Sequence, residues 1–159
     1  MKLLLDANAF LTPALTYYAF DICGGYWNWL AQAAAEGKVA SIAPVKRELQ
    51  QKDDQVKNWI EMHGSSIFMP DDASIRNSMG QVASWASSNG YTSAAVSDFL
   101  SKADSYLIAY ALHGNHQIVT LETRAPGSRS KIKIPDAGDA HGISSISPFE
   151  MLRRNGVRL

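Results

Sequence analysis

The amino-terminal residues form a short apolar run that ends abruptly in polar residues. Leu3, Leu4 and Leu5 are consecutive, and Asp6 and Asn8 follow them. A run without a polar face is typical of a strand buried on both sides, as in a parallel sheet. A helical pattern begins at residue 9, so Asp6 is expected at the carboxyl end of a central strand. In open α/β sheets that edge is where ligands bind.

The rest of the chain alternates between helical spacing and short apolar runs. Further strands are expected at residues 38–42, 66–69, 117–120 and 143–146, with an edge strand at 131–134. Helices are expected at 9–19, 26–35, 43–49, 53–62, 71–89, 101–112 and 147–152, with a short helix or ordered loop at 92–100 and a short helix near 135–136. Strands separated by helices predict one domain over residues 1–159. Its predicted fold is a three-layer α/β/α sandwich around a mostly parallel central sheet.

Composition is that of an ordinary globular chain, with 46% hydrophobic and 19% charged residues among 159. No run approaches the roughly 18 apolar residues that a membrane span needs. The apolar start is too short for a signal peptide and runs into an acid. Cys23 is the single cysteine, which excludes an intramolecular disulfide and fits a reducing compartment. These features predict a cytoplasmic protein.

Charge is balanced over the whole chain but unevenly distributed along it. Residues 1–122 hold 8 Lys/Arg and 12 Asp/Glu, a net charge of −4, whereas residues 123–159 hold 7 and 3, a net charge of +4. An acidic body with a basic end favours a metal-holding pocket beside an anion-binding surface. Chance asymmetry in a short tail explains the difference equally well.

Four carboxylates are expected at one edge of the sheet. Asp6 and Glu122 follow predicted strands, Glu48 lies about one turn into the helix after the second strand, and Asp104 lies in the first turn of the helix before the fourth. Converging carboxylates repel one another unless a divalent ion lies between them. Mg²⁺ takes oxygen ligands and retains several waters, so two or three acids suffice.

Each acid also has a purely structural alternative. Asp6 or Asn8 can cap the helix that follows the strand. Glu48 can pair with Lys52 on the surface of its helix. Asp104 can form a capping box with Ser101, although apolar residues on the same helix face direct it toward the sheet. Glu122, taken alone, is an ordinary loop residue.

Other chemistries find less support. Cys23 has no evident histidine partner, and the four histidines lack the spacing of metal ligands. The sequence contains neither a glycine-rich phosphate loop nor a Gly-x-Ser-x-Gly elbow.

In four motifs, in order, the chain resembles the PIN domain family and, within it, the VapC-like toxins of bacterial and archaeal toxin–antitoxin pairs. The matching motifs are Leu4-Leu5-Asp6-Ala7-Asn8, Val45-Lys46-Arg47-Glu48-Leu49, Ala103-Asp104-Ser105-Tyr106-Leu107-Ile108-Ala109-Tyr110-Ala111 and Ile118-Val119-Thr120-Leu121-Glu122. A further motif over residues 131–136, together with residues 149–152, is similar to a PIN subgroup that carries this addition.

The resemblance implies an endoribonuclease that depends on Mg²⁺ or Mn²⁺ and hydrolyses RNA with a metal-activated water. It also implies a protein antitoxin as partner, and it allows a homodimer. The first three acids of the family correspond to Asp6, Glu48 and Asp104. The fourth family acid is usually aspartate, and its position is occupied by Glu122, whose extra methylene favours a water-mediated metal contact. The polar residues that would orient the acids are Asn8 and Thr120.

Two other functions remain open from the sequence. One is a PIN fold that has lost catalysis and binds RNA or protein. The other is a phosphotransfer domain with Asp6 as nucleophile, although the first motif lacks the second aspartate of such enzymes. For an RNA-binding surface the sequence favours four cations between Glu122 and Asp136, unless they only protect an edge strand from pairing. These cations are Arg124, Arg129, Lys131 and Lys133.

Overall fold

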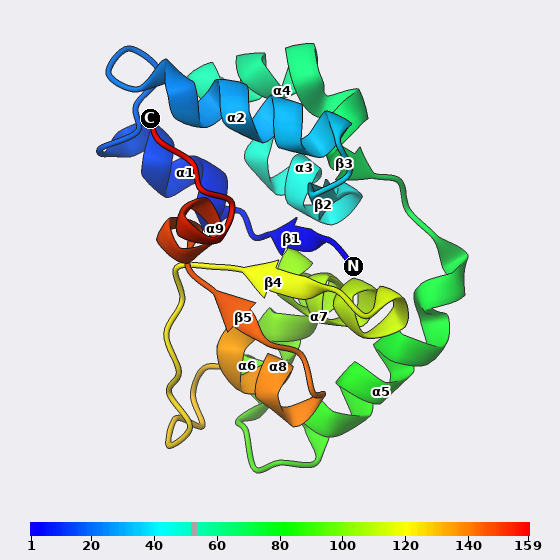
Figure 1. Ribbon diagram of the computed structural model, residues 1–159. Helices are drawn as coiled ribbons and strands as arrows, with labels where there is room; N and C mark the ends of the chain where they lie inside the picture. Colours follow the sequence, from blue (N-terminus) through cyan, green and yellow to red (C-terminus); the bar gives the residue numbers. More distant parts are fainter. Residues whose placement is uncertain (52–53) are drawn as a thin grey trace.

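A five-stranded sheet, parallel in every described strand pair, forms the centre of the protein (Figure 1). The computed structural model describes residues 1–51 and 54–159. The strands follow the spatial order β3-β2-β1-β4-β5. Their bounds are Leu3–Leu5 (β1), Val39–Ile42 (β2), Phe68–Met69 (β3), Gln117–Val119 (β4) and Ser145–Ile146 (β5). The predicted α/β class with a parallel sheet is confirmed.

Helices flank the sheet in two groups (Figure 1). Helices α1, α2 and α4 pack with one another beside β1 and β2, whereas α5, α6 and α8 gather around α7, which packs against β4. The helix bounds are Asn8–Leu15 (α1), Gly24–Ala35 (α2), Ala43–Leu49 (α3), Gln55–Ile67 (α4), Arg76–Ser87 (α5), Ser93–Ser101 (α6), Ala103–Gly114 (α7), Ile134–Ala140 (α8) and Pro148–Arg154 (α9), with a 3₁₀ turn over Ala73–Ile75 (η1).

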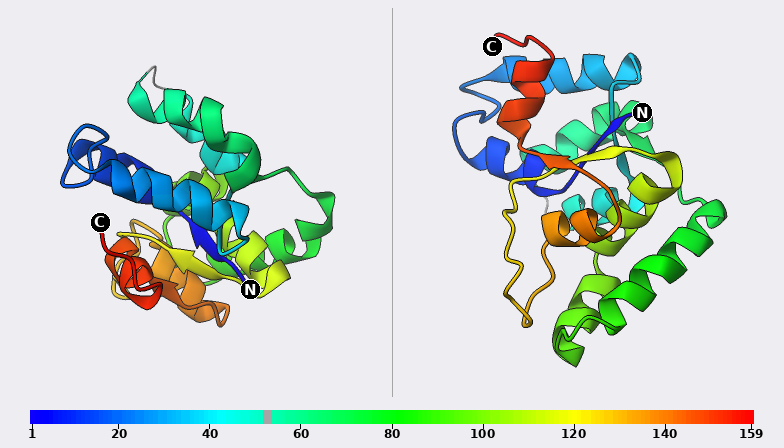
Figure 2. Two further views of the ribbon diagram at one scale, coloured as in Figure 1. Left: turned by 45° about the horizontal axis from the view of Figure 1, so that its top comes forward. Right: turned by 60° about the horizontal axis from the view of Figure 1, so that its bottom comes forward.

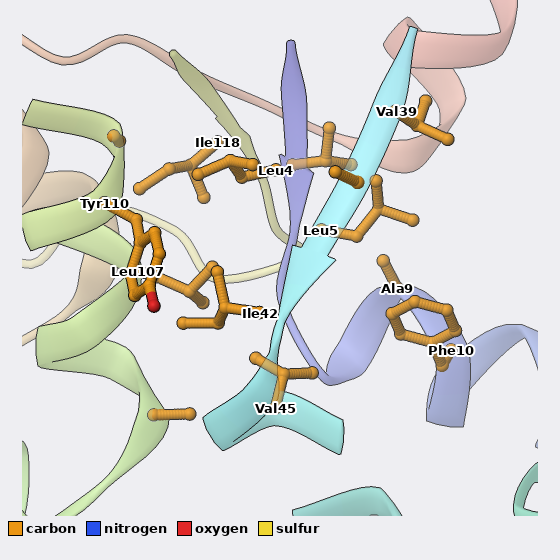
Figure 3. Close-up of a cluster of buried hydrophobic side chains, with 14 of the residues drawn as sticks. Leu4, Leu5, Ala9, Phe10, Val39, Ile42, Val45, Leu107, Tyr110 and Ile118 are labelled. Carbon is orange, nitrogen blue, oxygen red and sulfur yellow. The ribbon is translucent and has the colours of Figure 1, made fainter. Parts of the chain in front are cut away.

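The hydrophobic core lies on both faces of β1, as a strand without a polar face requires. Leu4 and Leu5 are fully buried, and Figure 3 shows them between side chains from α1 and from α7. Phe10 and Leu107 contribute from these two helices. Full burial of a side chain of this size stabilises the fold by about 1.5–3 kcal/mol. The leucine run therefore fixes the strand whose end carries Asp6.

Helix α1 is shorter than predicted and holds Pro13 in its interior. Proline has no N–H, so the carbonyl of Ala9 four residues earlier has no helical donor. The buried hydroxyl of Tyr26 donates to that carbonyl at 2.6 Å. The helix ends at Leu15, four residues before the predicted end at residue 19.

Helix α4 is longer than its sequence pattern predicts. It continues through Gly64 to Ile67, so the strand expected at 66–69 shrinks to two residues. Gly64 lies inside the helix, so it does not end the helix as the sequence pattern indicated. The predicted start at Asp53 lies outside the described residues, and the helix begins after a cap by Asp54.

The edge strand expected at 131–134 is wrong. Ile132 and Ile134 are both buried, and Ile134 begins helix α8 with a proline in its first turn. The alternation arises because Ile132 and Ile134 are buried on either side of the half-buried Lys133, and these residues form no strand. Residues 123–133 belong to a long loop between β4 and α8. This 123–133 loop projects away from the strands (Figure 2).

The carboxyl ends of β1 and β4 define the place where a site is expected. These strands are neighbours, yet the chain leaves β1 toward β2 on one side and returns to β4 on the other. Such a switch in strand order opens a crevice at the carboxyl ends of the strands. In the described part of the chain, no helix is long and apolar enough to cross a membrane.

Candidate functional site

An acidic cleft of about 570 Å³ lies at the carboxyl ends of β1 and β4. All four predicted acids line it, together with one acid that the sequence did not indicate. Two cations, Lys102 and Lys131, also belong to its lining. The five acids are Asp6, Glu48, Asp98, Asp104 and Glu122. Their convergence from β1, α3, α6, α7 and the end of β4 follows from the parallel topology.

Asp6 is the most buried of these acids, with 5% of its surface exposed. Its Oδ1 accepts a hydrogen bond from Ala7 N at 2.7 Å, and its Oδ2 accepts one from the Thr120 hydroxyl at 2.9 Å. The pKa of Asp6 is raised to about 7, first by burial and then by the negative charge of Asp104. The hydrogen bond from Thr120 lowers the pKa by less than these effects raise it. The ionised form is thus costly in the protein alone.

Thr120 and Asn8 hold Asp6 in place through a small network. The Thr120 hydroxyl, which donates to Asp6, accepts from Asn8 Nδ2 at 3.2 Å and from Glu122 N at 3.1 Å. Asn8 Oδ1 accepts from Leu121 N at 3.0 Å. Helix α1 has no side-chain cap from its N-cap residue, Ala7. Asn8 and Thr120 therefore join the ends of β1 and β4 beside the carboxylate.

Asp104 faces the cleft from the first turn of α7 and is half-buried. Its pKa is raised to about 6, chiefly by burial and then by the charges of Glu122 and Glu48, while nearby Lys102 lowers it. The charges of Asp104 and Glu122 in turn raise the pKa of Asp6. The four predicted acids consequently form one electrostatic cluster.

Glu48 has a structural task in addition to its place in the cleft. Its Oε1 accepts from Ala103 N at 2.9 Å, the amide at the first residue of α7. The predicted capping box of Ser101 with Asp104 is wrong, because Ser101 ends α6 and its hydroxyl donates to Asp98 O. The alternative pairing of Glu48 with Lys52 lies outside the described residues.

Glu122 also binds a backbone amide. Its Oε2 accepts from Ile134 N at 2.7 Å, the first residue of α8. Asp136 in the same helix accepts in return from Ala125 N at 2.8 Å. The two bonds fasten both ends of the 123–133 loop. Glu122 and Ile134 are twelve residues apart in the sequence, so this bond joins the two ends of the loop.

The four cations predicted to contact RNA have different positions. Lys131 lines the acidic cleft. Arg124 instead forms a two-point ion pair with Asp139, at 2.6 and 3.0 Å. Arg129 donates to two carbonyls of its own loop and lies 5.3 Å from the ring of Tyr91. Lys133 is half-buried. None of these three lines the acidic cleft.

Two cleft residues were missed from the sequence. Asp98, in α6, pairs with Lys102 at 2.9 Å, and both border the cleft at the junction of α6 and α7. Their spacing of four on a helix was the available signal, but it is common on solvated helix surfaces. Only the approach of α6 to α7 makes the pair part of this site.

The cleft supplies the donor atoms that a hard divalent cation takes, since carboxylate oxygens suit Mg²⁺ and Mn²⁺. The pKa values of Asp6 and Asp104 are raised first by burial and then by the charges of neighbouring acids, which a bound cation would offset. Among residues 1–51 and 54–159, no three His, Cys, Asp or Glu side chains already stand in metal-binding geometry. The residues thus fit a cation in chemistry and charge, and the side chains would have to close around it.

A comparison with protein families gives one match over nearly the whole chain. The model of a domain of unknown function, DUF4411, matches residues 3–159. The chain belongs to the DUF4411 family. The matched part of this DUF4411 protein contains the parallel sheet and every acid of the cleft. Neither a curated protein nor a solved structure gives a significant match.

Proposed function

We propose that this DUF4411 protein is a divalent-metal-dependent endoribonuclease of PIN-like type. The convergence of carboxylates at the switch between β1 and β4 is the observation that carries the proposal, and burial followed by neighbouring acids raises the pKa of both Asp6 and Asp104. A group of like charges at a ligand-binding edge is costly to stability and fits a role in catalysis. The all-parallel strand order is compatible with a PIN-like fold.

The chain's own residues have separate tasks in this reaction. Asp6 and Asp104 would hold Mg²⁺ or Mn²⁺, with Glu48 contributing through the oxygen that Ala103 leaves free. A bound cation supplies a water of lowered pKa and neutralises charge that develops on a phosphodiester. Thr120 keeps Asp6 aligned. Lys102 and Lys131 at the cleft offset the repulsion between the acids and the incoming phosphate.

Glu122 would act through a water or through the loop, since one of its oxygens is engaged by Ile134 N. Its bond to α8 also sets the position of Lys131, three residues before that helix. The biological setting that we propose is a cytoplasmic toxin held inactive by a protein antitoxin, with RNA as substrate. Expression of the wild-type protein alone should arrest bacterial growth, and expression of Asp6→Asn should not.

The direct test is RNA cleavage by the purified protein. Wild type should cleave single-stranded RNA with Mg²⁺ or Mn²⁺ and should stop when EDTA is added. Asp6→Asn should retain the fold and lose cleavage, whereas the exposed Asp21→Asn is a matched control that should cleave normally. Cleavage by Asp6→Asn at the wild-type rate would exclude Asp6 from the reaction.

A second candidate is a PIN-like fold that binds RNA or protein without catalysis. The bonds of Glu48 and Glu122 to backbone amides favour it, because both acids already have a structural role. Metal binding without RNA cleavage would support this candidate over the nuclease.

A further inference from the structure

A second cavity of about 570 Å³ lies among η1, α5 and α7 and shares no lining residue with the acidic cleft. Tyr106 and Tyr110 of α7 form one side, and Met79 and Arg76 of α5 form another. Asp72, just before η1, lies at its edge. Aromatic and thioether groups beside a few polar groups are typical of a small-molecule site.

Helix α7 connects this cavity with the acidic cleft. Tyr106 and Tyr110 are four residues apart in α7, so they share a helix face about 6 Å apart along the axis, and Lys102 is the extended residue directly before the helix. Lys102 lines the cleft, and the two tyrosines line the cavity. Helix α3 also lies between the cleft and the cavity. Its Glu48 lines the cleft, and its Arg47 pairs with Asp71, which lines the cavity. An RNA strand that leaves the cleft would thus meet Lys102 and then the rings of Tyr106 and Tyr110.

The cavity wall is fixed before any ligand binds. The Tyr110 hydroxyl donates to Pro70 O at 2.9 Å and accepts from Asp72 N at 3.0 Å. Its side chain is buried, beside Leu107 in Figure 3. Tyr106 is half-buried and packs against the same core. A rigid aromatic wall loses little conformational entropy when a flat ligand stacks on it.

The charges around the cavity are arranged for a ligand that is both a hydrogen-bond donor and an anion. Asp71 is neutralised by Arg47, which donates to both of its carboxylate oxygens at 2.8 and 3.3 Å. Asp72 Oδ1 accepts from Ser74 N, and a carboxylate has further acceptor capacity. Arg76 is exposed and lies in the wall. Acceptor, flat apolar face and cation together match a base with an exocyclic amino group and its phosphate.

We propose that this cavity is a base-binding pocket of the RNA site, in which Tyr106 stacks on a nucleobase whose amino group donates to Asp72, while Arg76 contacts the adjoining phosphate. The inference rests on the proposed nuclease function, because it makes the cavity the specificity pocket for a base near the scissile bond. It selects bases such as cytosine, whose N4 amino group donates where uracil presents an acceptor.

The test measures RNA affinity in the catalytically inactive Asp6→Asn protein, with twelve-residue oligo(C) and oligo(U) as probes. Tyr106→Ala should weaken oligo(C) binding about 5- to 150-fold, the effect of losing one stacked base. Tyr106→Phe retains the ring and should bind as Asp6→Asn does, and Tyr17→Ala, at a tyrosine remote from the cavity, is the matched control. Arg76→Gln should reduce the salt slope by about 0.7, as for one phosphate contact on a single strand.

The outcomes separate the pocket from the nuclease. Unchanged affinity in both Tyr106→Ala and Arg76→Gln, or equal binding of oligo(C) and oligo(U), would overturn the pocket even if the wild type cleaves RNA. Tyr106-dependent, cytosine-selective binding by a wild type that never cleaves would retain the pocket and refute the nuclease. If Tyr106→Ala fails to fold, as circular dichroism would reveal, the salt slope of Arg76→Gln and the choice between probes decide the matter.

Discussion

Among the four acids predicted for the cleft, the two aspartates and the two glutamates differ in their structural roles. Glu48 and Glu122 each give one oxygen to the first backbone amide of a helix. Asp6 and Asp104 instead have raised pKa values because burial and neighbouring acids penalise their charge. A residue that costs stability is better explained by function than one that caps a helix. Asp6 and Asp104 are therefore the stronger indicators of function among the four predicted acids.

The largest expected effect is on RNA cleavage, which should depend more strongly on the two aspartates than on the two glutamates. Asp104→Asn should lose cleavage to the background level, because a neutral amide cannot replace an anionic ligand at the half-buried position. Glu122→Gln should lose only about 10- to 100-fold, the range for residues that act on a metal indirectly. Rates measured under single-turnover conditions would check this. Equal loss in both variants would make Glu122 a direct ligand and remove the distinction.

The next effect is on stability and its dependence on pH. A raised carboxyl pKa means that stability is fully present below the unfolded value near 4 and is lost as pH rises through the folded value. For Asp6, whose folded pKa is about 7, the metal-free protein should lose stability between about pH 4 and 7, on the order of 4 kcal/mol. Asp104, with a pKa of about 6, acts in the same direction over a narrower range.

Urea unfolding of the metal-free protein across this pH range would measure that loss. Asp6→Asn should flatten the dependence, because the amide does not ionise. A pH profile of Asp6→Asn that follows the wild-type profile would assign the dependence to other groups.

A smaller effect should distinguish the capping role of Glu48 from its charge. Glu48→Gln retains an acceptor oxygen for Ala103 N and should unfold near the wild-type urea midpoint. Glu48→Ala leaves that amide without its partner and should cost about 0.5–2 kcal/mol, as for other lost helix caps. Equal stability of the two variants would show that the bond to Ala103 contributes nothing.

The smallest effect concerns the basic loop. Lys131→Gln should reduce the salt slope of RNA binding by about 0.7, because Lys131 lines the cleft. Arg124→Gln should leave the slope almost unchanged, because Arg124 is already paired with Asp139. Both are measured in the Asp6→Asn protein to prevent turnover. A larger change in Arg124→Gln than in Lys131→Gln would reverse the assignment.

Much of the fold follows from local pattern, and the details of the site do not. The leucine run predicts β1 and places Asp6 at its end, because a short apolar run without a polar face is typical of a strand buried on both sides. The pairing of Glu48 with Ala103 spans 55 residues, and no local signal reports which amide a glutamate will meet. The same holds for Glu122 and Ile134, whose bond depends on how the 123–133 loop returns to the sheet.

Two wrong predictions have the same physical origin. Alternation at 131–134 has the period of a strand, but tertiary packing buries Ile132 and Ile134 as separate anchors. Gly64 is a residue type that often ends helices, but α4 continues through it to Ile67. In both cases packing overrides a local preference.

Cation binding to the metal-free protein tests the central claim, that the crowded acids form a site for a divalent ion. Calorimetric titration with Mn²⁺ near pH 7 should show binding with release of protons, because part of Asp6 is protonated at that pH. Comparison of buffers with different ionisation enthalpies measures the protons released, and Asp21→Asn serves as control. We predict that Asp6→Asn and Asp104→Asn bind Mn²⁺ more weakly and that Asp6→Asn releases fewer protons. Wild-type affinity and proton release in both variants would contradict the account.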